Sequence, residues 1–332
     1  MLQDLRRPLQ HKGLSDRTVQ IIAASWRAST KNQYYVFIRK WKQFCSNKSI
    51  NYMQATPERV LEFLTDLYFV HGASYSSLNT ARSALAAFLI LDGPYSVGSH
   101  PLISRFLKGA FQLRPPKPRY SQIWDVKIVL NFLRKWSPAN CLSLKQLTLK
   151  LVMLMALTSA QRAQALHKLN LEKMKLKEGS VCFGYDVLLK QHRPGNASSE
   201  LKLRAYPVDR RLCVIRYLQQ YICRTRHIRG EAKQLFVSFQ KPHKPVTKQT
   251  ISRWIKTTMS LAGIDTDTYK PHSTRAAATS AANRSEVPVE EILSKAGWSN
   301  EKTFRKYYQK PLHVEGEKFA CAVLKSGSCP KN

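Results

Sequence analysis

Acidic residues are scarce in this sequence. The chain has 332 residues, with 21 Asp and Glu against 54 Lys and Arg, so its formal net charge is +33. This excess is far larger than solubility requires. It indicates a polyanionic partner, because each cation that contacts a phosphate releases counterions and adds affinity. Nucleic acid is the favoured partner, and a merely solvated basic surface is the alternative.

Membrane-targeting features are also missing. Residues 1–14 contain no hydrophobic signal core. The longest apolar run, residues 149–157, is interrupted by Lys150 and is too short to cross a bilayer. No long amphipathic helix with a purely basic polar face is evident. We therefore expect an intracellular protein without a membrane partner.

Cysteine pairs with metal-binding spacing are absent. The seven cysteines are scattered, and none forms a C-x-x-C pair. This usage favours a reducing compartment and argues against a zinc module. Cys213, Cys223 and His227 are conceivable ligands, but they fall on an apolar helical stripe, so we predict buried thiols there. We expect no metal and no cofactor.

The length suits two domains, because single cores rarely exceed about 250 residues. The first, residues 15–113, is predicted to be a helical bundle. Ser29 or Thr30 would cap one helix, and Thr56-Pro57-Glu58 has the capping hydroxyl, first-turn proline and acid that start another. Ser76 or Ser77 would open a third helix, and Pro101 a fourth.

A proline-rich segment follows the bundle. Residues 114–119 read Arg-Pro-Pro-Lys-Pro-Arg, and three prolines in six residues exclude a helix and favour an extended chain. We interpret this segment as a basic interdomain linker whose cations can follow a phosphate backbone.

The second domain, residues 120–312, is predicted to be mainly helical with a small antiparallel sheet. Helical patterns cover 125–135, 144–157, 212–222 and 250–261, and further helices start near Thr274, Pro288 and Ser299. Between them, residues 181–183, 187–189 and 201–203 have the period-two pattern of short strands. Residues 313–332 form a C-terminal tail, in which the apolar stretch 319–324 could dock on its own domain or on a neighbouring subunit.

One local segment has the composition of a phosphate pocket. His272 and Arg275 are three residues apart behind Pro271, which places both side chains on one face at the positive end of a helix. Such a pair suits an anion. An H-x-x-R pair alone is nevertheless a weak catalytic signal.

The residues downstream strengthen this signal. A helix ends at Gly297 and is followed by Trp298, and the next helix carries Tyr307 and Tyr308. This order resembles the C-terminal half of the tyrosine recombinases, the phage-integrase family. There, Gly-His or Gly-Trp follows H-x-x-R and the nucleophilic tyrosine comes about ten residues later.

The resemblance extends over about residues 15–312. Residues 157–162, Leu-Thr-Ser-Ala-Gln-Arg, look like the segment with the first family arginine, and 188–190, Leu-Leu-Lys, look like the strand lysine. The N-terminal bundle resembles the core-binding domain. The phrases at 162–167, 272–277 and 297–299 are most similar to eukaryotic DIRS-like and Crypton mobile-element recombinases.

The resemblance implies metal-free phosphoryl transfer. Negative charge builds on the non-bridging oxygens during attack on a DNA phosphodiester, and two arginines can bind them. A tyrosine would form a 3′-phosphotyrosyl link, and a lysine would protonate the 5′ leaving oxygen. The implied catalytic residues are Arg162, Lys190, His272, Arg275, Trp298 and Tyr308.

Three details stay open in the sequence. Lys202, Arg193 or Arg204, instead of Lys190, could be the cation that reaches the 5′ leaving oxygen. Tyr307 has the spacing of many bacterial members, whereas Tyr308, four residues after Phe304, fits the mobile-element group and is preferred. Many members also carry an acid three residues after the first arginine, where this chain has Ala165.

We therefore predict a site-specific DNA recombinase or integrase of a mobile element, acting on duplex DNA as a homo-oligomer. If the source is a eukaryote, the DNA substrate implies the nucleus. A type IB topoisomerase-like enzyme and an inactive, domesticated DNA-binding protein are the alternatives.

Overall fold

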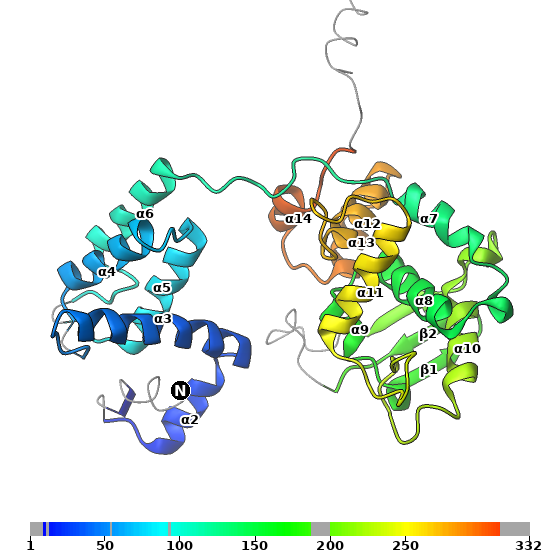
Figure 1. Cartoon of the computed structure of the whole chain (residues 1–332), viewed down its shortest axis with the longest axis horizontal. Coiled ribbons are helices and arrows are strands. Elements are labelled where there is room, and N and C mark those ends of the chain that lie inside the picture. The colour runs from blue at the N-terminus through cyan, green and yellow to red at the C-terminus, as the bar shows by residue number, and fades with distance from the viewer. Residues whose placement is uncertain (1–8, 11–12, 54, 92–93, 187–199, 313–332) are drawn as a thin grey trace, which may run out of the picture. The chain divides into compact units, whose positions relative to one another are not determined.

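The structure is a computed structural model, and it describes residues 9–10, 13–53, 55–91, 94–186 and 200–312 (Figure 1). The chain divides into two compact units, Met1–Pro118 and Arg119–Asn332. Residues 114–119, which join them, are all exposed.

The N-terminal unit is a bundle of helices. The predicted helices are present as α3 (Ala28–Asn47), α4 (Pro57–Phe69), α5 (Tyr75–Phe88) and α6 (Pro101–Leu113), preceded by α2 (Asp16–Ala24), which the sequence pattern did not reveal. Trp41 is fully buried in this core. Its ring contacts Phe44 and Phe63, and its indole N–H donates to the Tyr52 carbonyl at 2.9 Å. Aromatic packing therefore fixes this bundle.

Two of the predicted helix starts are wrong by a few residues. Thr56 caps α4 as predicted. Helix α5 is capped by Ser74, whose hydroxyl accepts the Ser77 N–H, so Ser76 and Ser77 lie inside the first turn. Helix α3 starts after Arg27. In both cases an earlier residue already takes the extended backbone of a cap, which moves the start of the helix upstream.

The C-terminal unit surrounds one buried helix. Helix α8 (Leu144–Ser159) is buried on all sides and packs against α10 (Val214–Thr225), α11 (Lys248–Leu261) and α12 (Ser273–Arg284). Its apolar residues therefore form no single stripe. The other helices of this unit are α7 (Val126–Lys135), α9 (Ala163–His167), α13 (Val289–Ala296) and α14 (Glu301–Tyr307).

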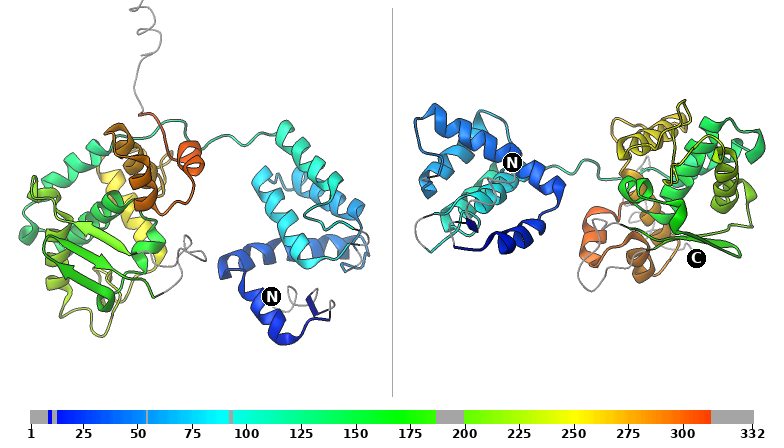
Figure 2. Two further views of the ribbon diagram at one scale, coloured as in Figure 1. Left: turned by 180° about the vertical axis from the view of Figure 1, so that it is seen from behind. Right: turned by 90° about the horizontal axis from the view of Figure 1, so that it is seen from below.

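A small antiparallel sheet completes this unit (Figure 2). Its order is β1 (Met174–Lys177), β2 (Ser180–Phe183) and β3 (Leu201–Arg204), and Val181 is paired with Leu176 and Leu203. Strands β2 and β3 confirm the predictions at 181–183 and 201–203, whereas β1 was missed because it is a mostly exposed, lysine-containing edge strand. The strand predicted at 187–189 lies outside the described residues. The mainly helical fold with a small antiparallel sheet is thus confirmed.

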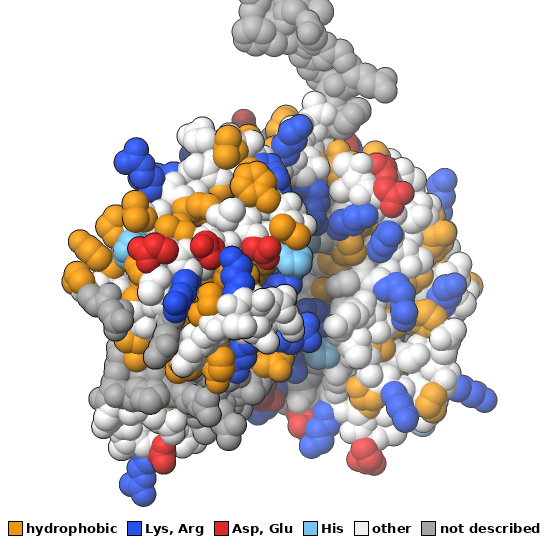
Figure 3. Space-filling view, turned by 60° about the vertical axis from the view of Figure 1, so that its left-hand side comes forward, with side chains coloured by type: hydrophobic (Ala, Val, Ile, Leu, Met, Phe, Trp, Pro, Cys, Tyr) orange, Lys and Arg blue, Asp and Glu red, His pale blue; other side chains and the backbone are white. Residues whose placement is uncertain are grey.

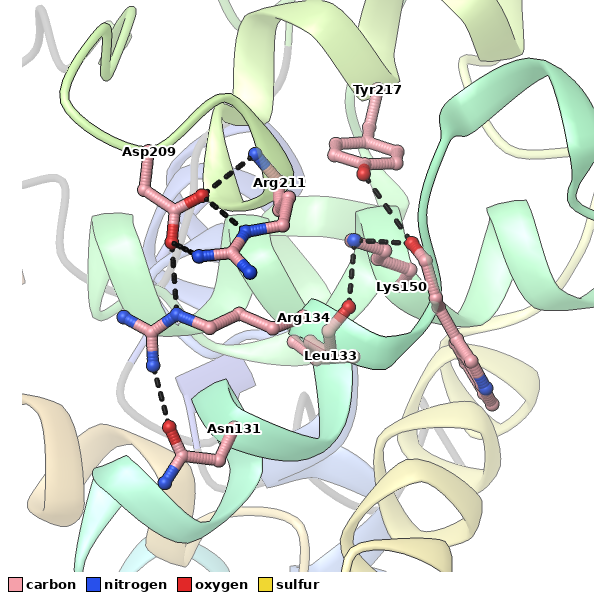
Figure 4. A network of polar contacts seen from close by, with 8 residues as sticks. Asn131, Leu133, Arg134, Lys150, Asp209, Arg211 and Tyr217 are labelled. Atoms are coloured by element: carbon pink, nitrogen blue, oxygen red, sulfur yellow. Dashed lines mark hydrogen bonds and ion pairs between the residues drawn. The ribbon is translucent and has the colours of Figure 1, made fainter.

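Lys150, the charge inside the apolar run, is fully buried in α8 (Figure 4). Its Nζ donates to the carbonyls of Leu133 at 2.7 Å and Trp136 at 2.6 Å, and lies 3.9 Å from the centre of the Tyr217 ring. Leu133 and Trp136 are at the C-terminal end of α7, where the Leu133 carbonyl also accepts the Trp136 N–H at 3.1 Å and the last carbonyls have no α-helical partner. Lys150, inside α8, therefore donates hydrogen bonds to the carbonyl groups at the end of α7.

The predicted buried thiols are only partly present. Cys213 is buried, but Cys223 is exposed, so the prediction is wrong for Cys223, which lies on the solvent side of α10. Within the described ranges, no group of three or more His, Cys, Asp and Glu side chains could hold a metal ion. None of the helices described is both long enough and apolar enough to span a membrane.

Candidate active site

The site begins where α8 stops. Ala160 follows the helix in the left-handed conformation, with φ 51° and ψ 23°, which is rare for a residue with a side chain. This turn ends α8 and places Arg162 at the N-cap of α9. Backbone strain of this kind is held in place only by its surroundings, and Arg275 provides that support.

Arg275 is 1% exposed and bonds to the ends of two helices. Its Nη1 donates to the Ala160 carbonyl at 2.9 Å and its Nη2 to the Ala296 carbonyl at 2.6 Å. Ala160 caps α8, and Ala296 is the last residue of α13, just before Gly297 in the left-handed region with φ 66°. The negative ends of these helices therefore stabilise a buried cation without a carboxylate.

Two aromatic rings complete the surroundings of Arg275. Its Cζ lies 4.2 Å from the ring centre of Trp298 and 5.5 Å from that of Tyr308. Burial, followed by the positive charge of Arg162, lowers the pKa of Arg275 to about 9, and Tyr308 opposes this shift. The guanidinium remains charged at neutral pH, and an arriving anion would relieve both its desolvation and the repulsion between the two arginines.

A pocket of about 260 Å³ opens beside these cations. Arg162, His272 and Arg275 line it, although they come from two different elements. His272 is exposed at the N-cap of α12, and Arg275 follows one turn later, so the predicted shared face is present. The pocket is thus a concentration of positive charge at the start of a helix, which suits a phosphate.

Tyr308 directs its hydroxyl toward this cluster. The hydroxyl oxygen lies 3.1 Å from Nε2 of His272, and the ring centre is 4.3 Å from that of Trp298. The backbone is held as well, because Ser280 Oγ donates to the Tyr308 carbonyl at 2.6 Å. Tyr307, in contrast, is 58% exposed, and its ring lies beside the surface cation Lys306.

Two buried donors at the site have no acceptor. Nε of Arg275 and Nε1 of Trp298 are both shielded from solvent and form no hydrogen bond. An unsatisfied buried donor costs about 1–3 kcal/mol. Such groups call for a functional explanation, and a bound oxyanion would supply the missing acceptors.

A family model described as the phage integrase family matches residues 127–312, more than half of the chain. The chain belongs to the phage integrase family. It is a tyrosine recombinase, because enzymes of this family cleave DNA through a tyrosine intermediate. A search of curated protein sequences finds no match.

Solved structures of recombinases share the fold of this family member. A XerH site-specific recombinase bound to palindromic difH substrate, in a post-cleavage complex, matches with a TM-score of 0.59 and 13% identity, over 88% of this chain and 79% of that chain. The Tn1549 transposon integrase in complex with transposon right end DNA matches with a TM-score of 0.59 and 13% identity, over 99% of each chain. A lambda integrase dimer bound to a COC′ core site reaches 0.51 at 13% identity, over 96% and 78%. At this identity the likeness shows the fold alone.

The recombinase structure brings five of the six predicted site residues together: Arg162, His272, Arg275, Trp298 and Tyr308. Lys190 lies outside the described residues. Of its alternatives, Arg193 also lies outside them, and Lys202 is exposed and pairs with Glu200 at 3.8 Å. Ala165 is 4% exposed and packs in the interior, so no carboxylate supports Arg162 from that position.

The sequence pattern did not reveal the residues that position the site from the side of the linker. Trp124 Nε1 donates to Oγ of Ser273, the first residue of α12, at 2.9 Å, and both side chains are buried. The adjacent Ile123 N–H donates to the Pro311 carbonyl at 2.8 Å, three residues beyond Tyr308. The segment that follows the linker therefore bonds both to the start of α12, which carries Arg275, and to the chain just beyond Tyr308. Only the tryptophan, directly after a linker, was a sequence signal for this contact.

Proposed function

We propose that this recombinase breaks and rejoins duplex DNA at specific sites with Tyr308 as its nucleophile. The observation that carries the proposal is the position of the Tyr308 hydroxyl, 3.1 Å from His272 and beside two arginines that lack a carboxylate partner in the described structure. A phenol, a proton-accepting ring and two phosphate-binding cations are what attack on a phosphodiester requires.

The proposed step forms one P–O bond and breaks another. The Tyr308 oxygen attacks the scissile phosphorus and gives up its proton, for which Nε2 of His272 is the adjacent acceptor. The bond from phosphorus to the 5′ oxygen breaks, which leaves a 3′-phosphotyrosyl link. The charge on the non-bridging oxygens is stabilised by Arg162 and Arg275 together with the unpaired N–H groups of Arg275 and Trp298. Attack by a 5′ hydroxyl reverses the step and rejoins a strand.

The 5′ oxygen leaves as an alcohol only if it receives a proton. We assign this proton to Lys190, because an amine can act as a general acid near neutral pH, whereas a guanidinium stays protonated. The indole of Trp298 donates a hydrogen bond but cannot transfer a proton. Its packing on Tyr308 instead limits the directions that the phenol ring can take.

The partners follow from charge and from the related structures. Lys and Arg side chains are more numerous than Asp and Glu on the face drawn in Figure 3, in keeping with the net charge of +33. Lambda integrase was solved as a dimer on a core site and as a tetramer on a Holliday junction, which supports assembly of several copies of this chain on duplex DNA.

A mobile element is the proposed source. The phrases at 162–167, 272–277 and 297–299 support an affinity with DIRS-like and Crypton recombinases, and the fold shared with a transposon integrase agrees with such an origin. In a eukaryotic host the enzyme would act in the nucleus.

The test measures covalent trapping and strand transfer by the enzyme on a pool of nicked duplexes of random sequence. The short fragment beyond the nick carries the 5′ hydroxyl that would rejoin the strand, so its dissociation traps the phosphotyrosyl adduct. The adduct is recovered after denaturation, and its DNA is sequenced. A second duplex with a free 5′ hydroxyl is then supplied. Joined products are expected from a recombinase, relaxation of a supercoiled plasmid without joining would indicate a topoisomerase, and binding without any adduct would indicate an inactive DNA-binding protein.

A further inference from the structure

The pocket beside the arginines extends beyond the residues that are assigned to the scissile phosphate. Its other wall is the first part of α11, from which Lys248, Ser252 and Ile255 reach the lining. We propose that Lys248 and Ser252 form a second anion subsite, which takes the phosphate next to the scissile phosphate on the same strand. This inference rests on the proposed function, because it extends the path of the cleaved strand.

The geometry of α11 places both side chains on one face. Lys248 and Ser252 are four residues apart, which is one helical turn. Ile255 continues the same face and is 2% exposed, so it closes the pocket toward the core. The subsite thus has a cation and a hydroxyl over an apolar base, which suits a phosphate that keeps one side in water.

The backbone of α11 adds to this positive character. Lys248 is the first residue of a 14-residue helix, and among its backbone N–H groups that of Thr250 donates to the Thr247 side chain at 3.3 Å. The first N–H groups of a helix have no internal acceptors and carry its positive end. A phosphate oxygen at Lys248 would therefore meet side-chain and backbone donors together.

The charges around the pocket favour an anion rather than a cation or a neutral group. No carboxylate lines the pocket, while Arg162, Arg275 and Lys248 do. Nε of Arg275, whose side chain is 1% exposed, has no acceptor in the same pocket. The lining therefore favours an anionic ligand.

A DNA strand supplies anions at the required repeat. Successive phosphates of one strand are linked through a single sugar, so a phosphate held by the arginines brings its neighbour close to the adjoining wall. The pocket continues from the arginines to α11 without a change of sign in charge. One strand can therefore occupy both subsites.

The test measures the salt dependence of binding to a nicked 30-base-pair duplex. Lys248→Gln removes one proposed phosphate contact, so the slope of log affinity against log salt should decrease in magnitude by about 0.9. Lys248→Arg keeps the charge and should keep the slope. Arg253→Gln is the matched control, because Arg253 is exposed on α11, does not line the pocket and carries the same charge. Equal slopes for Lys248→Gln and wild type, or equal losses for Lys248→Gln and Arg253→Gln, would overturn the proposal.

A second measurement locates the phosphate. A neutral methylphosphonate is placed on either side of the cleaved phosphate in a duplex recovered as a covalent adduct. At one of these positions the substitution should weaken binding by wild type several-fold but leave binding by Lys248→Gln unchanged. Independent losses at both positions would refute the subsite. Failure of the proposed function is distinguishable, since it would abolish the adduct in wild type and in Arg253→Gln alike, whereas failure of the subsite alone would leave both adducts intact.

Discussion

Nε2 of His272 lies 3.1 Å from the hydroxyl oxygen of Tyr308, although 36 residues separate them in the chain. The two rings are also in edge contact, with centres 5.8 Å apart. This contact joins the start of α12 to the residue that caps α14. A phenol held against an imidazole beside two arginines is the arrangement that the proposed attack by Tyr308, with His272 as proton acceptor, requires.

The contact between His272 and Tyr308 predicts a role for the imidazole in cleavage. His272→Gln keeps a polar side chain but removes the proton acceptor, and general-base assistance contributes about 10²–10⁴-fold to a rate. We expect the adduct to form at least about a hundredfold more slowly, with unchanged duplex affinity. Single-turnover cleavage at saturating DNA measures this. An unaltered rate would assign His272 to packing only.

Arg162 offers a cleaner test of the phosphate clamp than Arg275. Arg275 also bonds to Ala160 and Ala296, so its removal would disturb two helix ends. Arg162 is half-buried and lines the pocket, and its side chain forms no hydrogen bond or ion pair with the residues that the structure describes. We expect Arg162→Ala to retain the wild-type melting temperature while raising the cleavage barrier by about 3 kcal/mol. A stable variant that cleaves normally would remove Arg162 from the clamp.

The contact between Trp124 and Ser273 predicts control of the site from the linker side. Trp124→Phe removes the indole N–H but keeps an aromatic ring, so one buried hydrogen bond to the start of α12 is lost. We expect a cleavage rate at saturating DNA several-fold below wild type, because His272 and Arg275 lie on that first turn. Ser273→Ala should give the same loss, and the double variant should be no slower than either single one. Additive losses would mean that the two side chains act separately.

Lys150 predicts a pH-dependent stability. Burial lowers the pKa of Lys150 to about 7 from its ordinary value of 10.5. Between these values the unfolded chain binds more protons than the folded chain, so the free energy of unfolding rises with pH. Relative to Lys150→Met, which cannot titrate, wild type should gain about 1–3 kcal/mol between about pH 7 and about pH 9. Urea unfolding at both pH values measures the difference, and parallel pH profiles would contradict it.

The sequence predicted local features better than distant contacts. The helix around His272 and Arg275 could be read from its spacing, because residues three apart always share a helical face. The pairing of Arg275 with the carbonyls of Ala160 and Ala296 could not, since backbone carbonyls carry no residue signature. Lys150 similarly interrupted an apolar run, but its partners at the end of α7 depend on packing that no local pattern contains.

The choice between Tyr307 and Tyr308 could not be made from local sequence either. Adjacent residues on a helix point about 100° apart, so one of them had to face away from the arginines. Spacing from Trp298 did not decide which one. The structure places Tyr308 against Trp298 and leaves Tyr307 largely exposed, because the chain turns at Tyr308, where α14 ends.

The most direct measurement is peptide mapping of the covalent DNA adduct. Wild type, Tyr308→Phe and Tyr307→Phe are incubated with the trapping duplex, digested with protease and analysed by mass spectrometry. We predict a nucleotide-bearing peptide linked through Tyr308 in wild type and in Tyr307→Phe, and no adduct in Tyr308→Phe despite unchanged duplex binding. An adduct on Tyr307, or one that persists in Tyr308→Phe, would contradict the account.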